Sequence, residues 1–448
     1  MSREILQHAP KRPYDEPLVW TVSGGPEYRA YLKPILKQWQ TIGLDPILVV
    51  ALDAETALYV CELGYTAVLW DLPKASYSKV ADAKFEVAAT LAELGIPAFF
   101  MEVDVFCKES PLPLFLQTKG RGIVVSGHGF ADFVPNIGQY YVEPLQRTAD
   151  FFRSVTKVLT YSKNHKTFVT QSGGIAEFFD QRLFYQCLPP TNRNDANYNS
   201  SQTMHLLDDH HNNLLAICRN VSHSKPFPWT TVSNVYISAH SPPTVFESTI
   251  CVHPLAETPF SSFRLKLATA KFLGFDPEPV QPKERFLKTL TGDLTFNECW
   301  AFPFVGDASW PKMRFHHQKF LNFFVSLVLF AKKSGRTLVL PRYFRDQNAF
   351  AIPILSLIDV RTIEAHVPYK YLPTGMKQRV VLADGNYDHL LQELQSDDQI
   401  IAIDRFCEFA NKTQPEEEEV IRSLTCCMHD RRVTFTKSIG SWSRLCGQ

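Results

Sequence analysis

The chain has 448 residues, of which 45% are hydrophobic and 21% are charged, as in an ordinary large globular protein. Lysine plus arginine and aspartate plus glutamate number 46 each, so the formal net charge is zero. This balance excludes a strong overall attraction to nucleic acid or to an anionic membrane, so any anion that binds needs a local site. The length favours two domains.

The first half of the chain alternates strand-like and helix-like segments. Strand patterns occur at residues 18–23, 45–53, 66–71 and 98–106, and helical patterns lie between them at 27–43, 54–64 and 79–95. This βαβ alternation predicts an α/β fold with a parallel sheet covered by helices. Ligands bind such sheets at the carboxyl ends of the strands. The polar residues at those ends are Ser23, Asp53, Asp71, Glu102 and Asp104.

The amino-acid composition changes between the two halves of the chain. The proline-rich segment "DPEPVQPKE" (residues 276–284) is typical of an interdomain linker. Beyond it, a long apolar helix at residues 317–333 is followed by strand patterns at "RTLVLP", "RVVLAD" and "QIIAID". We therefore predict a first domain over residues 1–284 and a smaller C-terminal α/β domain over residues 285–448.

Two carboxylates stand out in the stretch "FFMEVDVFCKESPLPLF" (residues 99–115). On a strand, Glu102 and Asp104 would point to the same face because side chains alternate with a period of two. Burying both would be costly unless a positive group lies between them, and oxygen ligands suit Mg²⁺ or Mn²⁺. The spacing thus favours a divalent-metal site that neutralises a sugar diphosphate. The alternative is a pair of surface residues at a strand end.

Three further positions fit a nucleotide site, each with a plainer alternative. Ser23 and Gly24 form an open turn where the backbone could approach a nucleotide, or a simple tight turn. Asp53 could accept a hydrogen bond from a ribose or a uracil, or cap the following helix. Lys84 could contact phosphates, or lie solvated on its helix.

Longer segments resemble the nucleotide-diphospho-sugar transferase domain of glycosyltransferase family 77. The family has a helix with a lysine–aromatic pair, here Lys84-Phe85, followed by a strand that ends in an acidic motif and by a proline loop. The segments "PNIGQYYVEP", "FFDQRLF" and "ICVHPLAE" resemble later family motifs in the same order. The stretch "FLNFFVSLVLFAKKSGRTLVLPRYF" is similar to the module that follows the catalytic domain in plant arabinosyltransferases of the family.

This resemblance implies a GT-A-like (Rossmann-like) fold and a site for Mn²⁺ or Mg²⁺. It implies that Glu102, Asp104 and His253 bind the metal. It also implies that Asn136 and Gly138 line the donor or acceptor pocket. Asp180 and Gln181 would contact sugar hydroxyls, and Asp180 is a candidate nucleophile or a residue that only orients a hydroxyl.

The implied activity is a retaining transfer of an arabinose-, galactose- or xylose-type sugar from a UDP-sugar to a glycan or glycoprotein hydroxyl. Glu102 departs from the family, which usually has aspartate there, so we expect Asp104 to be the principal metal ligand. This departure keeps open a non-catalytic carbohydrate- or nucleotide-binding protein on the same fold. A dinucleotide-dependent oxidoreductase is set aside because no G-x-G-x-x-G follows the first strand.

The location and the cysteines lead to two further expectations. The N-terminus lacks the apolar core of a signal peptide, and no apolar stretch reaches the roughly 20 residues that span a bilayer. We therefore expect a cytoplasmic chain without a membrane span, or a lumenal Golgi enzyme if an anchor lies outside this sequence. The ten cysteines show no disulfide or metal spacing, which predicts reduced, mostly buried thiols.

Overall fold

The computed structural model divides the chain into two compact units, Met1–Leu255 and Ala256–Gln448. It describes residues 16–70, 77–118, 120–128, 131–165, 168–169, 183–184, 187–188, 205–206, 218, 229–233, 235–240, 245–254, 263–278, 283–289, 294–295, 324–341, 343–345, 351–353, 360–372, 376–382 and 386–404. The boundary that the proline-rich segment predicts, between residues 284 and 285, stays a prediction.

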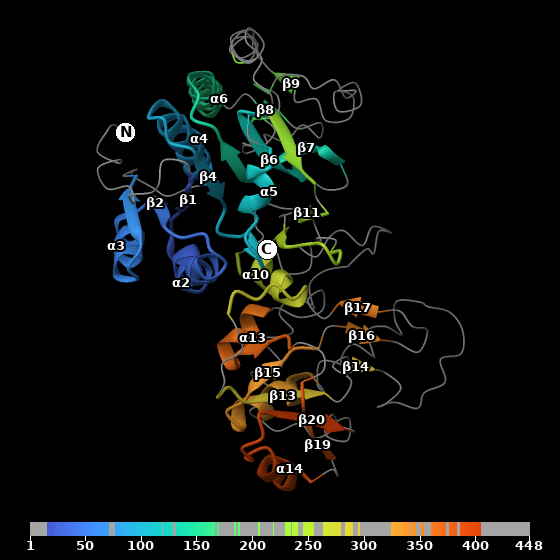
Figure 1. Cartoon of the computed structure of the whole chain (residues 1–448). Coiled ribbons are helices and arrows are strands. Elements are labelled where there is room, and N and C mark those ends of the chain that lie inside the picture. The colour runs from blue at the N-terminus through green and yellow to red at the C-terminus, as the bar shows by residue number, and fades with distance from the viewer. Residues whose placement is uncertain are drawn as a thin grey trace. The chain divides into compact units, whose positions relative to one another are not determined.

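The first unit is built on a seven-stranded sheet (Figure 1). Its strands in spatial order are β3 (Thr66–Leu69), β2 (Ile47–Ala51), β1 (Leu18–Ser23), β4 (Ala98–Met101), β7 (Ala131–Val142), β6 (Ile123–His128) and β10 (Trp229–Val232). All are parallel except β7, which is antiparallel to both β4 and β6. The order reverses between β1 and β4, so the switch point of this doubly wound arrangement lies at their carboxyl ends. The predicted α/β class is confirmed.

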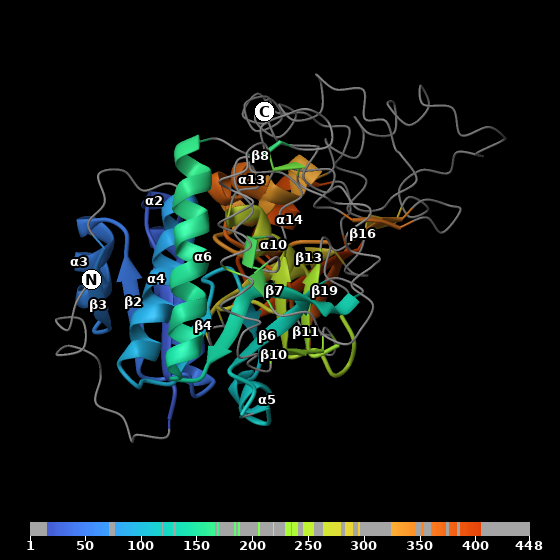
Figure 2. The same cartoon turned by 90° about the horizontal axis from the view of Figure 1, so that it is seen from above.

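Alternating apolar residues explain how this sheet is packed. Leu18, Trp20 and Val22 on β1 belong to a core that also contains residues of two helices on the same face. The helices of this unit are α2 (Pro26–Thr41), α3 (Ala54–Glu62), α4 (Tyr77–Glu93), α5 (Leu112–Leu116) and α6 (Gln146–His165). Helices α4 and α6 cover that face side by side (Figure 2). All six residues of β1 are buried, which is the pattern of a central strand with both faces covered.

A smaller sheet extends the first unit beyond β4. It contains β11 (Ile237–His240), β12 (Cys251–Pro254) and β5 (Phe106–Cys107). The strand predicted over residues 98–106 is therefore wrong in one respect: β4 ends at Met101. Residues 102–105 form a turn in which the Val105 N–H donates to the Glu102 carbonyl oxygen at 3.0 Å. A two-stranded sheet of β8 (Phe168–Val169) and β9 (His205–Leu206) is also present.

The second unit has its own parallel five-stranded sheet, in agreement with the predicted C-terminal α/β unit. Its order is β18 (Tyr369–Lys370), β15 (Thr337–Val339), β13 (Phe286–Thr289), β20 (Ile400–Asp404) and β19 (Arg379–Leu382). A further sheet contains β14 (Leu294–Thr295), β16 (Tyr343–Arg345) and β17 (Ala351–Pro353). The helices are α10 (Phe263–Phe272), residues 324–333, α13 (Val360–His366) and α14 (Tyr387–Glu393).

Four cysteines of the first unit correct the expectation of reduced thiols. Cys107 is disulfide-bonded to Cys251, and Cys187 is bonded to Cys218. The expectation was wrong for these pairs because the fold brings together residues distant in the sequence, which spacing alone does not reveal; Cys107 and Cys251 meet through the pairing of β5 with β12. Cys61 is free and exposed.

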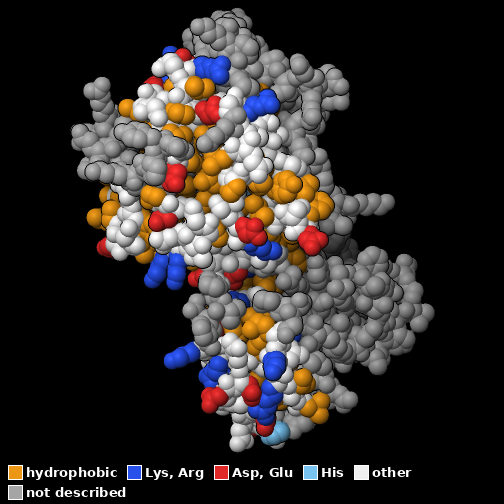
Figure 3. All heavy atoms as spheres, in the orientation of Figure 1, with side chains coloured by type: hydrophobic (Ala, Val, Ile, Leu, Met, Phe, Trp, Pro, Cys, Tyr) orange, Lys and Arg blue, Asp and Glu red, His pale blue; other side chains and the backbone are white. Residues whose placement is uncertain are grey.

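The described surface agrees with the balanced composition. Figure 3 shows acidic and basic side chains interspersed on the visible face of each unit, without an extended patch of one sign. Within the described ranges, no helix combines the length and the apolar composition that crossing a membrane requires.

Candidate metal and nucleotide site

Three potential metal ligands converge just beyond the carboxyl end of β4. The His253 Nε2 atom lies 3.2 Å from Glu102 Oε2 and 3.5 Å from Asp104 Oδ1. One ligand atom from each of these three residues lies within 4.8 Å of the other two. Asp104 and His253 are each only 5% exposed. Glu102 is half-buried. Two carboxylates so close together and shielded from solvent are typical of a site built for a cation.

The turn and the small sheet create this convergence. Glu102 and Asp104 lie in the turn between β4 and β5, so their common direction comes from the turn rather than from strand pleating. Strand β12 carries His253 and pairs antiparallel with β5 through Val252 and Phe106. The Cys107–Cys251 disulfide joins the same two strands covalently. It therefore ties the segment with the carboxylates to the segment with the histidine.

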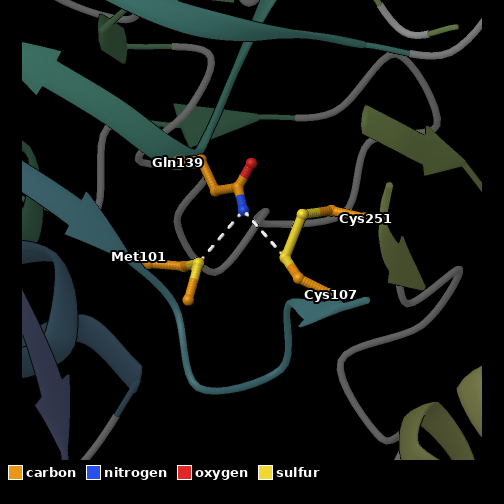
Figure 4. The surroundings of a disulfide bond; sticks show 4 residues. All are labelled: Met101, Cys107, Gln139 and Cys251. Atoms are coloured by element: carbon orange, nitrogen blue, oxygen red, sulfur yellow. Dashed lines mark hydrogen bonds between the residues drawn. A yellow bond between two sulfur atoms is a disulfide. The ribbon is translucent and has the colours of Figure 1, made fainter. Parts of the chain in front are cut away.

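Figure 4 shows the surroundings of this disulfide. The Gln139 side chain, from β7, directs its amide nitrogen between two sulfur atoms. Its Nε2 donates to Met101 Sδ at 3.1 Å and to Cys107 Sγ at 3.7 Å. Because Gln139 is buried, these contacts pack the last residue of β4 against the disulfide directly beneath the turn.

A buried lysine compensates the charge of Glu102. Lys84 of α4 is 1% exposed, and its Nζ lies 2.5 Å from Glu102 Oε1 and 5.4 Å from the centre of the Phe100 ring. Burial alone would raise the pKa of Glu102, but the charge of Lys84 and the hydrogen bond from His253 lower it below its usual range. Glu102 is thus held as a carboxylate. The phosphate contact predicted for Lys84 stays a prediction.

The imidazole of His253 is held from its other side by β7. Its Nδ1 lies 3.1 Å from Asn136 Oδ1, and that oxygen also accepts the Gly138 N–H at 2.9 Å. Burial would lower the pKa of His253, but the carboxylates of Asp104 and Glu102 outweigh it and raise the pKa. Asn136 and Gly138 thus lie behind the histidine, and their predicted role as pocket lining stays a prediction.

The chemistry of this cluster fits a divalent cation. Carboxylate oxygens are the ligands that Mg²⁺ and Mn²⁺ prefer, and one imidazole nitrogen completes a mixed set. Lys84 balances one of the two carboxylates, so a second carboxylate remains for a metal or for a protonated His253. The residues present therefore fit the metal that the sequence motif implies.

The neighbouring strand end, after β1, contains the predicted nucleotide residues. Ser23 is 2% exposed, and its Oγ has no hydrogen-bond partner in the described part of the chain. A Cβ atom on Gly24 would lie 2.7 Å from Leu52 Cβ, so this close approach of backbone requires glycine. An orphaned hydroxyl beside a glycine turn at a switch point is a suitable nucleotide contact.

Asp53 takes the plainer of its two predicted roles. Its carboxylate caps α3 by accepting the Thr56 N–H at 2.7 Å, and it also accepts the Gly25 N–H at 2.7 Å. Arg29 lies 3.4 Å away. Burial raises the pKa of Asp53, but these hydrogen bonds and the charge of Arg29 lower it by a larger amount, so the net shift of the pKa is downward. A contact with ribose or uracil stays a prediction.

The structure groups the predicted residues into two sets and leaves one set undescribed. The cluster after β4 contains Glu102, Asp104, His253, Lys84, Asn136 and Gly138. The second set lies at the end of β1 and consists of Ser23, Gly24 and Asp53. Asp53 follows the next strand and is joined to this turn because it accepts the Gly25 N–H. Asp180 and Gln181 lie outside the described residues.

Sequence reasoning missed the residues that support the cluster. Neither the Cys107–Cys251 bond nor the Gln139 contacts were predicted. A cysteine close to each half of the metal motif, in "VDVFC" and in "ICVHP", was the one available signal. With ten cysteines in the chain, that signal does not select the pair.

Comparison with known proteins identifies the segment that contains most of this cluster. Residues 42–238 match the family model of the nucleotide-diphospho-sugar transferases. A search among curated proteins finds no match.

Solved structures of several sugar transferases are similar to the chain. Galactosyltransferase LgtC, in complex with donor and acceptor sugar analogues, is 11% identical over 57% of this chain and 94% of its own, with a TM-score of 0.32. Mouse xyloside xylosyltransferase 1 is 8% identical over 55% of this chain and 99% of its own, with a TM-score of 0.32. The bifunctional glycosyltransferase WbbM is 9% identical over 56% of this chain and 48% of its own, also with a TM-score of 0.32.

The family match bears on the resemblance drawn from the motifs. The matched segment contains six of the seven strands of the main sheet and the turn with Glu102 and Asp104. Together with the strand order, it confirms the GT-A-like α/β fold that the motifs implied. Residues 42–238 of this chain are thus similar to the nucleotide-diphospho-sugar transferases, as the motifs implied.

Proposed function

We propose that the chain is a metal-dependent, retaining glycosyltransferase that uses a UDP-sugar. The observation that carries the proposal is the meeting of Glu102, Asp104 and His253 at the carboxyl end of β4. This is the switch point of a sheet within a segment that matches the nucleotide-diphospho-sugar transferases. The sugar would be of the arabinose, galactose or xylose type, and the acceptor a glycan or glycoprotein hydroxyl.

Each residue of the cluster has a distinct task in this proposal. Asp104 and His253 would hold Mn²⁺ or Mg²⁺ together with Glu102, and the bound metal would neutralise the diphosphate and make it a better leaving group. Lys84 keeps Glu102 ionised and oriented, because its ammonium lies against Oε1. The side chains of Val103 and Val105 are buried and so anchor the turn in the protein interior.

The donor would extend from this cluster towards the end of β1. Ser23 offers there a hydroxyl that has no hydrogen-bond partner among the described residues, and Gly24 lets the backbone approach a nucleotide. Asp180 and Gln181 would contact sugar hydroxyls, with Asp180 as the candidate nucleophile of a retaining reaction.

The test is turnover of a panel of UDP- and GDP-sugars with Mn²⁺, with Mg²⁺ and with a chelator. We expect UDP-sugar hydrolysis or transfer that requires the metal and is lost in Asp104→Asn. Glu109→Gln is the matched control because Glu109 is an exposed carboxylate shortly after the turn. Full activity of Asp104→Asn would contradict the metal assignment. UDP binding without any turnover across the panel would instead favour the non-catalytic binding protein.

We propose further that the chain works in an oxidising compartment. The two disulfides favour the lumenal location over the cytoplasmic one, because cytosolic thiols are kept reduced. Alkylation of the protein under denaturing conditions, before and after reduction, followed by mass spectrometry tests this. Modification of Cys107, Cys187, Cys218 and Cys251 without prior reduction would contradict the proposal.

A further inference from the structure

Asn136 lies behind the metal cluster rather than in it. It is fully buried on β7, and its side-chain oxygen meets two nitrogen atoms. The Gly138 backbone nitrogen is 2.9 Å from Oδ1, and His253 Nδ1 is 3.1 Å from the same oxygen.

The first of these contacts determines the orientation of the amide. A backbone N–H only donates, so the Asn136 atom that faces Gly138 must be the acceptor oxygen and not the NH₂ group. That oxygen has no proton to offer to His253. The hydrogen bond between Oδ1 and Nδ1 therefore requires the proton to reside on His253 Nδ1.

The consequence appears on the opposite side of the ring. A neutral imidazole has one proton, so a proton on Nδ1 leaves a lone pair on Nε2. Nε2 is the atom that lies 3.2 Å from Glu102 and 3.5 Å from Asp104. The lone pair therefore points to the place where the two carboxylates meet, as a metal ligand must.

Gly138 supplies an independent, steric part of the same arrangement. A Cβ atom at this position would lie 2.4 Å from both Cε1 and Nδ1 of His253, closer than any contact tolerates. The glycine thus lets the imidazole lie against β7, within reach of Asn136. Ser126 holds the same strand from β6, because its Oγ donates to the Asn136 carbonyl oxygen at 2.9 Å.

We propose that Asn136 is a positioning residue that locks His253 in the tautomer with the proton on Nδ1, and so presents Nε2 to the metal. Gly138 provides the space for this contact. The proposal rests on the proposed function only in that the ligand is a divalent metal. Partners of this kind, which hold the outer nitrogen of a histidine ligand, strongly influence metal affinity.

The first experiment measures the affinity of the full chain for Mn²⁺ alone, by electron paramagnetic resonance, in three variants. Asn136→Leu removes the acceptor and should weaken binding by about 10- to 100-fold. Asn136→Asp keeps an acceptor oxygen and should bind Mn²⁺ at least as tightly as the wild type at alkaline pH. The alkaline pH is needed because the added carboxylate favours the protonated form of the His253 imidazole at lower pH. Ser126→Ala, the matched control on the neighbouring strand β6, removes a hydrogen bond to the Asn136 backbone rather than to its side chain, and should bind as the wild type does.

The second experiment reads the tautomer without any metal. Nitrogen NMR of isotope-labelled histidine at alkaline pH distinguishes the two neutral forms, and His253→Gln identifies the signal. We expect the proton on Nδ1 in the wild type, in Asn136→Asp and in Ser126→Ala, and a mixture of tautomers in Asn136→Leu. A proton on Nε2 in the wild type, or an unchanged tautomer and Mn²⁺ affinity in Asn136→Leu, would overturn the proposal.

The two readouts separate this proposal from the proposed function. If the wild type binds no Mn²⁺ but has the Nδ1 tautomer, metal-dependent transfer fails while the role of Asn136 in orienting the ring is supported. If Asn136→Leu does not fold, Asn136→Asp decides: weak Mn²⁺ binding or loss of the Nδ1 tautomer in that folded variant overturns the proposal.

Discussion

Each unit of the molecule buries charged side chains, but the two sets are satisfied in different ways. In the second unit, Arg336 is 1% exposed and donates to the carbonyl oxygens of Leu394 at 2.8 Å and Asp398 at 2.7 Å, and also to that of Ser396. Its donors are thus used by the backbone around the end of α14. In the first unit, Glu102 and Asp104 face the same histidine, and like charges share a small space.

This difference separates a structural charge from a functional one. The Arg336 guanidinium needs no further partner, because neutral carbonyl oxygens surround a single cation. Its pKa is lowered to about 10, first by burial and then by the neighbouring charge of Arg285. The carboxylate cluster differs from Arg336, because two like charges repel each other there and a bound cation would relieve that repulsion. Substitutions in the first unit should therefore affect binding, and those at Arg336 should affect folding.

The largest effect is expected for the disulfide under the carboxylate cluster. Replacing both Cys107 and Cys251 with serine opens a bond between residues separated by 144 positions, which should lower the free energy of unfolding by about 4 kcal/mol. It should also weaken Mn²⁺ binding, because the strands that carry Asp104 and His253 lose their covalent tie. Chemical denaturation and Mn²⁺ titration measure the two effects.

The second disulfide is the matched control. Cys187 and Cys218 are separated by only 31 positions and lie on neither β5 nor β12. Their double serine variant should lose less stability and keep its Mn²⁺ affinity. Equal Mn²⁺ affinities in the two double variants would show that the disulfide beneath the turn does not support the metal site.

A slightly smaller loss of stability is expected for Arg336→Met. The variant keeps the apolar stem but leaves several buried carbonyl oxygens without donors, which should cost about 3 kcal/mol. Lys332→Met, at an exposed position on the preceding helix, should change stability little. Mn²⁺ affinity should be unchanged in both, and a weaker affinity in Arg336→Met would break the proposed separation of structural and functional charges.

Asp104→Asn should show the reverse pattern. Loss of the principal metal ligand should weaken Mn²⁺ binding at least ~100-fold, or about 2.7 kcal/mol. The metal-free protein should change in stability by less than about 1 kcal/mol, because the variant loses both a repulsion with Glu102 and an attraction to His253. Calorimetric titration and thermal unfolding of the same sample give both values. A large loss of stability would make Asp104 a structural residue like Arg336.

The smallest effect concerns the helix cap at Asp53 and depends on pH. The folded-state pKa of Asp53 is lowered, so its charge stabilises the fold above the unfolded pKa and this contribution is lost as the pH falls through the folded value. Asp53→Asn keeps a capping oxygen but loses the charge, which should cost about 1 kcal/mol or less at neutral pH. The difference from the wild type should shrink in acid, and a difference that is constant with pH would contradict this cause.

The local pattern of the sequence predicted most of the first sheet. The strand at residues 18–23 is observed as β1, and helix α4 begins and ends within two residues of the prediction. The strand predicted over residues 98–106 failed after Met101. Val103 and Val105 are buried in the turn and alternate with the acidic residues as strand residues do. Periodicity reports burial, and a buried turn of this kind has the same pattern as a strand.

The candidate site was less accessible to such reasoning. Glu102 and Asp104 are visible in the sequence because two acids interrupt an apolar run. His253 entered only through the family resemblance, since nothing local distinguishes it from a histidine in a buried strand. The ion pair between Lys84 and Glu102 was not predicted at all. Side chains on separate elements meet only when the sheet has formed.

The sequence by itself determined the α/β alternation, the absence of net charge and the placing of acidic residues at the end of the fourth strand. Only the tertiary structure decided that β12 pairs with β5, that Cys107 bonds to Cys251, and that Asn136 faces the outer nitrogen of His253. The physical reason is that hydrophobic periodicity acts over a few residues along the chain. The distances within the site depend on strand pairings between segments that are far apart in the sequence.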